Sequence, residues 1–209
     1  MKHYDYYYFD FDGTLVDTWK SLIRPFQVAY GHFGYQLTPS DVLHFTHMAM
    51  VQSCLEVGIT KEEDMLTLYQ ILSEEMKNEE DLKKIEVFPE VSEVLGALKK
   101  NDKKIAVVSG NSVTHIGRVL KIIGLDQYFD FYVGGDSTKN PKPFADPLLK
   151  AMELSGNPLK ETCLYIGDSL QDPECAKNAG IDGFLLDRKN EYAKEKWPVI
   201  HNLKELLND

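Results

Sequence analysis

Acidic and polar residues follow several apolar stretches of this chain, at points where a strand would end. The segment YYYFDFDGTLVDT (6–18) carries two aspartates just after a run of aromatic side chains. Later stretches end in Ser-Gly-Asn, in a loop with two lysines, and in a segment with two more aspartates. The candidate residues are Asp10, Asp12, Ser109, Asn111, Lys139, Lys142, Asp168 and Asp172. This pattern predicts a site for a charged ligand.

The residue types indicate one kind of chemistry. Four carboxylates in one place repel one another unless a cation lies among them, and oxygen ligands suit Mg²⁺. A carboxylate beside a cation stays ionised and can attack phosphorus, whereas a second carboxylate with a raised pKa can hold a proton. A hydroxyl, a lysine and the N–H groups of a glycine turn can bind a phosphoryl group. The set therefore predicts phosphoryl transfer to an aspartate.

The chain from about residue 86 alternates strand-like and helix-like segments after a first strand near the N-terminus. Strands are expected over 103–111, 127–135, 162–168 and, as the last strand, 181–187, and helices over 112–124, 146–156 and 173–180. Near-continuous apolar strands separated by helices are typical of a parallel sheet covered on both faces. The prediction is a doubly wound α/β core, which binds ligands outside the carboxyl ends of its strands.

Residues 17–85 interrupt this alternation with helical patterns and no evident strand. Amphipathic helices are expected over 18–34 and 61–85, with a shorter helical pair over 38–58. Pro25 should kink the first of these helices or reset its start. The sequence thus predicts a helical lobe of residues 17–85, inserted into a core of residues 1–16 and 86–209.

Composition limits the partners of the protein. The formal net charge is −10 over 209 residues, and the basic residues are scattered, which argues against binding of nucleic acid or an anionic membrane. No apolar run is long enough to span a bilayer, and no secretory signal is evident. The three cysteines form no C-x-x-C pair, which fits a reducing compartment. We expect a cytoplasmic protein, and no feature indicates its oligomeric state.

Four short motifs in order resemble those of a known family. They are DFDGTLVD at 10–17 preceded by an apolar strand, VVSGNS at 107–112, KPFADP at 142–147 and GDSLQD at 167–172. The sequence resembles the haloacid dehalogenase superfamily of aspartyl-nucleophile phosphatases over its whole length. Within that superfamily it is similar to the phosphoglycolate phosphatase-like branch, which has a helical cap between the first and second motifs. The resemblance implies a Rossmann-like core and a cap of residues 17–85.

The resemblance also implies roles for individual residues. Asp10 would be the nucleophile, Asp12 the acid and base, Ser109 a phosphoryl ligand, and Lys142 a clamp on Asp10 and the phosphate. Mg²⁺ would be held by Asp10, the main-chain carbonyl of Asp12, Asp168 and Asp172. Substrate contacts are expected from Thr14, Gly110, Asn111 and, within the cap, His47. The implied activity is an Mg²⁺-dependent phosphatase that hydrolyses a small phosphorylated metabolite through an aspartyl-phosphate intermediate.

Several of these residues have simpler interpretations. Asp172 precedes a proline and could instead cap a helix N-terminus. Asp12 and Ser109 could be ordinary turn residues. Lys139 competes with Lys142, although only Lys142 has the proline and Asp-Pro spacing of the family. His44 and His47 could pair on a metal, but no third ligand is evident.

Two other functions remain compatible with the motifs. A phosphomutase of the β-phosphoglucomutase kind shares them and returns the phosphoryl group to a bound sugar. A phosphorylatable signalling domain of the response-regulator type also combines acids, a hydroxyl, a lysine and Mg²⁺, but takes its phosphorylated aspartate from a later strand. The expected cap segment FTHMAMVQS (45–53) lacks the Gly-x-Pro loop common in the family, which argues against phosphoglycolate itself as the substrate.

Overall fold

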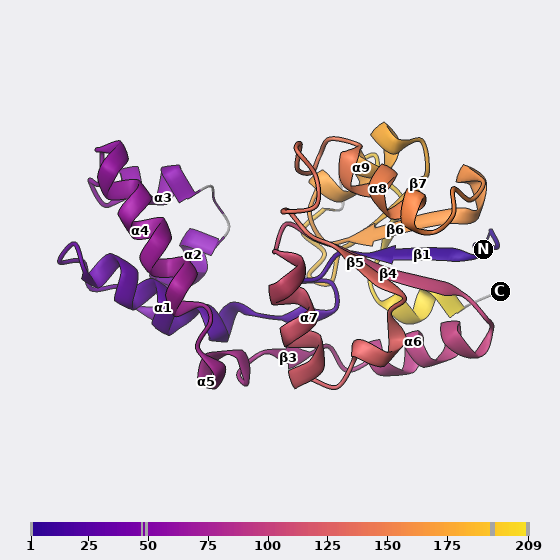
Figure 1. Cartoon of the computed structure of the whole chain (residues 1–209), viewed down its shortest axis with the longest axis horizontal. Helices are drawn as coiled ribbons and strands as arrows, with labels where there is room; N and C mark the ends of the chain where they lie inside the picture. The colour runs from indigo at the N-terminus through magenta and orange to yellow at the C-terminus, as the bar shows by residue number, and fades with distance from the viewer. Residues whose placement is uncertain (1, 47, 49, 193–194, 208–209) are drawn as a thin grey trace. The chain divides into compact units, whose positions relative to one another are not determined.

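The chain folds into two compact units in a computed structural model, which describes residues 2–46, 48, 50–192 and 195–207. One unit comprises Met1–Val16 with Val87–Asp209, and the other comprises Asp17–Glu86. The first unit contains the sheet, and the second is helical (Figure 1).

The first unit is built on a six-stranded parallel sheet with the order β5-β4-β1-β6-β7-β8. The strands are β1 (Tyr6–Phe9), β4 (Lys104–Val108), β5 (Phe131–Val133), β6 (Cys163–Gly167), β7 (Asp182–Leu186) and β8 (Val199–Ile200). In the central strand, Tyr8 pairs with Ala106 on one side and Tyr165 on the other. The strand order reverses at β1, so the carboxyl ends of β1, β4 and β6 surround the topological switch point.

Helices cover both faces of this sheet. They are α6 (Val91–Lys100), α7 (Val113–Ile122), α8 (Asp146–Leu154) and α9 (Gln171–Ala179), with short 3₁₀ turns η1 (Asp126–Tyr128), η2 (Lys160–Thr162) and η3 (Leu203–Leu207). α8 and α9 lie on one face, and α6 and η3 lie on the other (Figure 1). Buried side chains of the strands pack with Leu148 and Ala151 of α8 and Ala176 of α9. The strands are therefore held between two layers of helices, and this packing fixes the positions of their carboxyl ends, where the candidate site lies.

The predicted fold class, a doubly wound α/β core with an inserted helical segment, is confirmed. Two details of the strand predictions are wrong. The strand expected from residue 127 begins only at Phe131, because Asp126–Tyr128 forms the turn η1. Segment 181–187 is not the last strand, because β8 follows it. β8 has only two residues, too few to show a periodic pattern.

The second unit consists of α1 (Trp19–Gly31), α2 (Pro39–Thr46), α3 (Met50–Glu56), α4 (Glu62–Glu75) and α5 (Glu79–Leu82). Its core includes the buried aromatic residues Phe26, Tyr30 and Phe45. α1 begins at Trp19 and continues through Pro25, so this proline does not reset the helix start.

The single helix expected over 61–85 is instead two helices. The side chain of Asn78 accepts hydrogen bonds from the backbone N–H groups of Glu80 and Asp81 and so caps a new helix, α5. An asparagine that binds nearby backbone groups in this way competes with a continuous helix.

The chain passes between the units through β2 (Val16–Asp17) and β3 (Glu86–Val87), which form a two-stranded sheet. These short strands lie at the ends of the segment in which no strand was expected. Within the part of the chain that the structure describes, no helix is both long and apolar enough to cross a membrane.

Candidate active site

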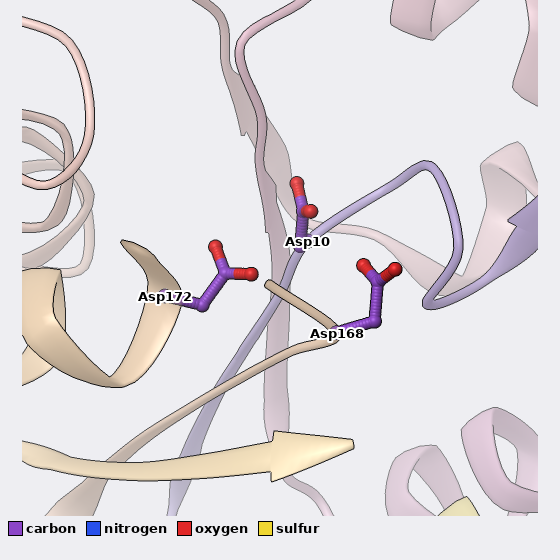
Figure 2. Close-up of side chains that lie close together, drawn as sticks. All are labelled: Asp10, Asp168 and Asp172. Atoms are coloured by element: carbon purple, nitrogen blue, oxygen red, sulfur yellow. The ribbon is translucent and has the colours of Figure 1, made fainter. Parts of the chain in front are cut away.

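Three aspartates meet at the carboxyl edge of the sheet. Asp10 directly follows β1, and Asp168 follows β6, whereas Asp172 lies in the first turn of α9. Figure 2 shows their carboxylates turned toward a common space, and one oxygen of each lies within 4.8 Å of the others. Asp10 and Asp172 are buried and Asp168 is half-buried. The predicted convergence of these carboxylates is thus present in the fold.

Burial and the neighbouring carboxylates both raise the pKa values of Asp10 and Asp168. Burial raises the pKa of Asp10 well above its usual value; the Lys142 ammonium opposes this, and the Asp172 and Asp168 carboxylates add to it. Burial and the charge of Asp172 raise the pKa of Asp168 to about 6. A cluster that is costly to ionise when empty favours a bound cation.

Lys142 supplies a positive charge to this cluster. Its Nζ lies 2.9 Å from Oδ1 of Asp10 and 2.6 Å from Oδ1 of Asp172. Burial favours the neutral amine, but the two carboxylates outweigh it and raise the pKa of Lys142, so the ammonium persists at neutral pH. Lys139, the competing lysine, has an exposed side chain. The lysine that touches the predicted nucleophile is therefore Lys142.

Asp172 is not the N-cap of a helix, because α9 begins at Gln171 and its N-cap is Leu170. Oδ2 of Asp172 accepts a hydrogen bond from the backbone N–H of Ser169 at 2.9 Å, and Oδ1 accepts from Lys142. The prediction that Asp172 occupies the N-cap position is therefore wrong, although its side chain does accept from a backbone N–H just before α9. The prediction assumed that Pro173 is the first residue of the helix, but α9 begins two residues earlier, at Gln171.

Asp12 lies on the turn after β1 and is held from β4. Nδ2 of Asn111 donates a hydrogen bond to Oδ2 of Asp12 at 2.5 Å. The backbone N–H of Asn111 in turn points at Oγ of Ser109, 3.2 Å away. Ser109 is buried, and Gly110 next to it is exposed, which leaves its backbone open to a ligand. The structure thus brings the second motif against the carboxylate expected to move protons.

Thr14, for which a substrate contact is expected, contacts the carboxylate cluster. Its side chain is fully buried, and its hydroxyl donates a hydrogen bond to Oδ1 of Asp168 at 3.2 Å. Thr14 therefore orients a carboxylate of the cluster. His47, expected to contact the substrate, lies outside the described residues, whereas Nε2 of His44 lies 3.1 Å from Oε2 of Glu56.

Two positions require glycine because the backbone there lies against a carboxylate of the cluster. Gly13 has a φ of +72°, and a Cβ there would lie 2.0 Å from Oδ2 of Asp168. At Gly167 a Cβ would lie 2.2 Å from Cγ of Asp172. Both positions let the backbone pass next to a carboxylate of the cluster, and a side chain at either would displace that carboxylate.

The donor set fits a small divalent cation. The cluster offers only carboxylate oxygens, the ligands that Mg²⁺ prefers, and includes neither histidine nor cysteine. Oxygens on opposite sides of Mg²⁺ are about 4 Å apart, since each lies about 2.1 Å from the ion. The separations in the cluster therefore need little adjustment to hold such an ion.

The Asp168→Asn variant should be more stable than the unsubstituted protein at pH 7 in the absence of divalent cations. A carboxyl group whose pKa is raised by folding contributes stability below its unfolded pKa, and that stability is lost as pH rises through about 6. Removing this charge should raise the free energy of unfolding by about 1–3 kcal/mol. Urea unfolding in EDTA measures this, and the gain should disappear at pH 4.

The same variant should respond less to Mg²⁺. Adding Mg²⁺ at pH 7 should stabilise the unsubstituted protein by mass action and shift Asp168→Asn little. A variant that is less stable than the unsubstituted protein in EDTA, or that gains as much from Mg²⁺, would contradict the assignment of Asp168 to a cation-binding cluster.

Two residues near the cluster had no role in the sequence predictions. Tyr165 on β6 directs its hydroxyl at Asp172 and Lys142, and burial raises its pKa well above the usual value. Arg188 follows β7 and donates to the main-chain oxygens of Gly13 and Thr14 at 3.3 and 2.8 Å. Its guanidinium also pairs with Glu90 and lies over the ring of Phe88 at 3.9 Å. Arg188 therefore fixes the turn that follows Asp10 and Asp12.

Comparisons with known proteins point to one family of hydrolases. A family model for haloacid dehalogenase-like hydrolases matches residues 7–186. Pyrophosphatase PpaX of Listeria monocytogenes is 33% identical over 173 residues, which cover 82% of this chain and 77% of the relative. A protein provisionally named pyrophosphatase PpaX in Caldanaerobacter subterraneus is 34% identical over 92% of this chain and 81% of its own length.

Solved structures show the same fold. A protein from Bacteroides fragilis, assigned to the haloacid dehalogenase-like hydrolases, superimposes with a TM-score of 0.84 and 27% identity, covering 97% of this chain and 99% of that chain. The family match, the relatives and the fold all point to the family that the four motifs resemble. This chain belongs to the haloacid dehalogenase-like hydrolases.

Proposed function

We propose that this protein is an Mg²⁺-dependent phosphatase that hydrolyses a small phosphorylated metabolite through an aspartyl-phosphate on Asp10. The observation that carries the proposal is the position of Asp10, buried between the Lys142 ammonium and the carboxylates of Asp168 and Asp172. A carboxylate nucleophile and an anionic phosphoryl group repel each other. The positive charge next to Asp10 offsets this repulsion and allows the substrate to bind.

In the first step, a carboxylate oxygen of Asp10 attacks phosphorus and forms the new P–O bond as the bond to the leaving oxygen breaks. Asp12 donates its proton to that leaving oxygen, so the product departs as a neutral hydroxyl compound. Asn111 holds the carboxyl group of Asp12 from the side of β4. This contact fixes the direction from which the proton is delivered.

In the second step, water attacks phosphorus and displaces the Asp10 carboxylate, which regenerates the enzyme and releases phosphate. Asp12, now ionised, takes a proton from that water. We assign the binding of the phosphoryl oxygens to the Ser109 hydroxyl, the backbone N–H of Gly110 and the Lys142 ammonium. All of these act on oxygens that carry negative charge in the transition state.

Mg²⁺ would be held by Asp10, the main-chain carbonyl of Asp12 and Asp168, and when bound it would neutralise charge on the phosphoryl oxygens. The position of Asp172 is different, because both of its oxygens already accept hydrogen bonds from the protein. We propose that Asp172 acts mainly by holding Lys142. The helical unit, Asp17–Glu86, is our candidate for the cap that selects the substrate.

A second candidate substrate is inorganic pyrophosphate. The relatives named pyrophosphatase PpaX, which are 33–34% identical to this chain, support it. Pyrophosphate presents the same terminal phosphoryl group to Asp10, with phosphate in place of an organic leaving group.

An initial-rate screen tests both candidates. Phosphate release is measured with Mg²⁺ and with EDTA over phosphosugars, phosphoglycolate, nucleotides and pyrophosphate, with Asp10→Asn as the blank. Mg²⁺-dependent release from an organic ester supports the phosphomonoesterase, and release from pyrophosphate alone supports the pyrophosphatase. Absence of release from every compound would overturn the proposal.

The Gly167→Ala variant should lower kcat about 100-fold, because misplacement of a catalytic group by about 1 Å has an effect of this size. The added Cβ displaces Asp172, which then no longer holds Lys142. Gly31→Ala is the control, since a Cβ there meets no atom within 4 Å. Equal kcat values for the two variants would show that the close approach at Gly167 has no catalytic consequence.

A further inference from the structure

A single buried hydroxyl contacts three of the four motif segments. Tyr165 lies on β6 and is fully buried. Its hydroxyl is 2.9 Å from the carbonyl oxygen of Val108, the residue directly before Ser109. The same hydroxyl is 3.0 Å from Oδ1 of Asp172 and receives a hydrogen bond from Nζ of Lys142 at 3.2 Å. No other described hydroxyl makes all of these contacts.

The hydroxyl limits where Lys142 can lie. A phenol has one proton to donate, so it serves either Val108 or Asp172 at a given moment, and it offers its lone pairs to Lys142. Nζ of Lys142 is thereby held by three oxygens, from Asp10, Asp172 and Tyr165. Because these three oxygens come from the end of β1, from α9 and from β6, the ammonium has a fixed direction toward Asp10.

A purely structural role would not require this hydroxyl. The ring of Tyr165 packs in the apolar cluster with Tyr8 and Val108, and phenylalanine would fill the same space. A buried hydroxyl is costly unless it is hydrogen-bonded, and here every partner belongs to, or directly precedes, a proposed catalytic segment.

We propose that Tyr165 is a positioning residue for the hydrolytic reaction, which acts through Lys142 by fixing its ammonium against Asp10. This inference rests on the proposed function. While it donates to the carbonyl oxygen of Val108, the hydroxyl can still accept from Lys142, so it links the segment that carries Ser109 to the lysine.

The chain offers a matched control on the neighbouring strand. Tyr8 is also fully buried, pairs with Tyr165 across β1 and β6, and places its hydroxyl 2.9 Å from Oγ of Ser155. Tyr8→Phe therefore removes a buried hydroxyl from the same cluster without touching Lys142, Asp172 or Asp10.

The experiment compares Tyr165→Phe, Tyr8→Phe, Lys142→Met and the double variant Tyr165→Phe, Lys142→Met, on the best substrate found in the screen. Rates are taken well below the thermal midpoint of each protein, so that the folded fraction is constant. Tyr165→Phe should lower kcat at least about tenfold with little change in KM, and Tyr8→Phe should leave kcat unchanged. In the Lys142→Met background, Tyr165→Phe should not lower kcat further, because the ammonium that Tyr165 positions is already absent.

The result that would overturn the inference is a kcat for Tyr165→Phe equal to that of Tyr8→Phe, or an undiminished loss in the Lys142→Met background. Failure of the proposed function differs from both, because the unsubstituted protein would then release no phosphate. A second measurement does not need a folded variant. In the unsubstituted protein, the Tyr165 hydroxyl proton should exchange slowly and show a nuclear Overhauser effect to the Lys142 ammonium, and absence of that signal counts against the contact.

Discussion

The Asp10→Asn variant is expected to lose hydrolysis almost completely, with kcat lowered by at least about 10⁴-fold. An amide at this position cannot attack phosphorus, and we expect no neighbouring group to replace it. Asp168 is a proposed cation ligand, both oxygens of Asp172 accept hydrogen bonds from the protein, and Lys142 is protonated. Initial rates with Mg²⁺ measure the loss. Mass spectrometry must exclude deamidation of the new asparagine back to aspartate.

The fold should survive this substitution. Burial raises the pKa of Asp10 and disfavours its charge, so a neutral asparagine should leave the metal-free protein at least as stable at pH 7. Asp182→Asn serves as the control, because Asp182 begins β7 at the opposite edge of the sheet and pairs with Lys2. Activity of Asp10→Asn within tenfold of this control would exclude Asp10 as the nucleophile.

The Lys142→Met variant is expected to lower kcat by about 10²–10³-fold, the usual effect of removing one donor that stabilises transition-state charge. It should also destabilise the protein at pH 7 by about 3–5 kcal/mol, because Asp10 and Asp172 are left buried without their counter-ion. The destabilisation should shrink as pH falls, since protonation of Asp10, whose pKa is raised, removes the unpaired charge.

Steady-state rates and urea unfolding at pH 7 and pH 5 measure the two effects. The control is Lys139→Met, which alters an exposed lysine of the same loop and should change neither quantity by much. If Lys139→Met lost more activity than Lys142→Met, the lysine assignment would be reversed. If destabilisation of Lys142→Met grew toward pH 5, the buried ion pair could not be its cause.

The convergence of the site could be predicted from the sequence because the topology is regular. Apolar strands such as Cys163–Gly167 need helices on both faces, parallel strands then share one carboxyl edge, and Asp10 and Asp168 each follow a strand directly. Lys142 could be distinguished from Lys139 because only Lys142 has the proline and Asp-Pro spacing of the family, and the structure places it against Asp10.

The remaining features depend on contacts that sequence spacing does not encode. Tyr165 reads as one more aromatic residue of a buried strand, and only packing reveals that its hydroxyl reaches Lys142. Arg188 lies in a loop, and its partners at Gly13 and Thr14 are more than 170 residues away in the chain. Asp172 could be interpreted as a helix cap because capping rules consider only nearby residues, whereas its partner Lys142 is 30 residues away in the chain. The only sequence signal for such a residue is a polar group within an apolar segment, and this signal does not identify its partner.

The most direct test of the account is to identify the residue that carries the phosphoryl group. The enzyme is mixed with the best substrate and Mg²⁺, quenched in acid within the first turnover, reduced with borohydride, and digested for mass spectrometry. Borohydride converts an aspartyl-phosphate to homoserine, so the account predicts homoserine at residue 10 and nowhere else. A burst of product with residue 10 unmodified, or with the modification on Asp12 or Asp168, would contradict it.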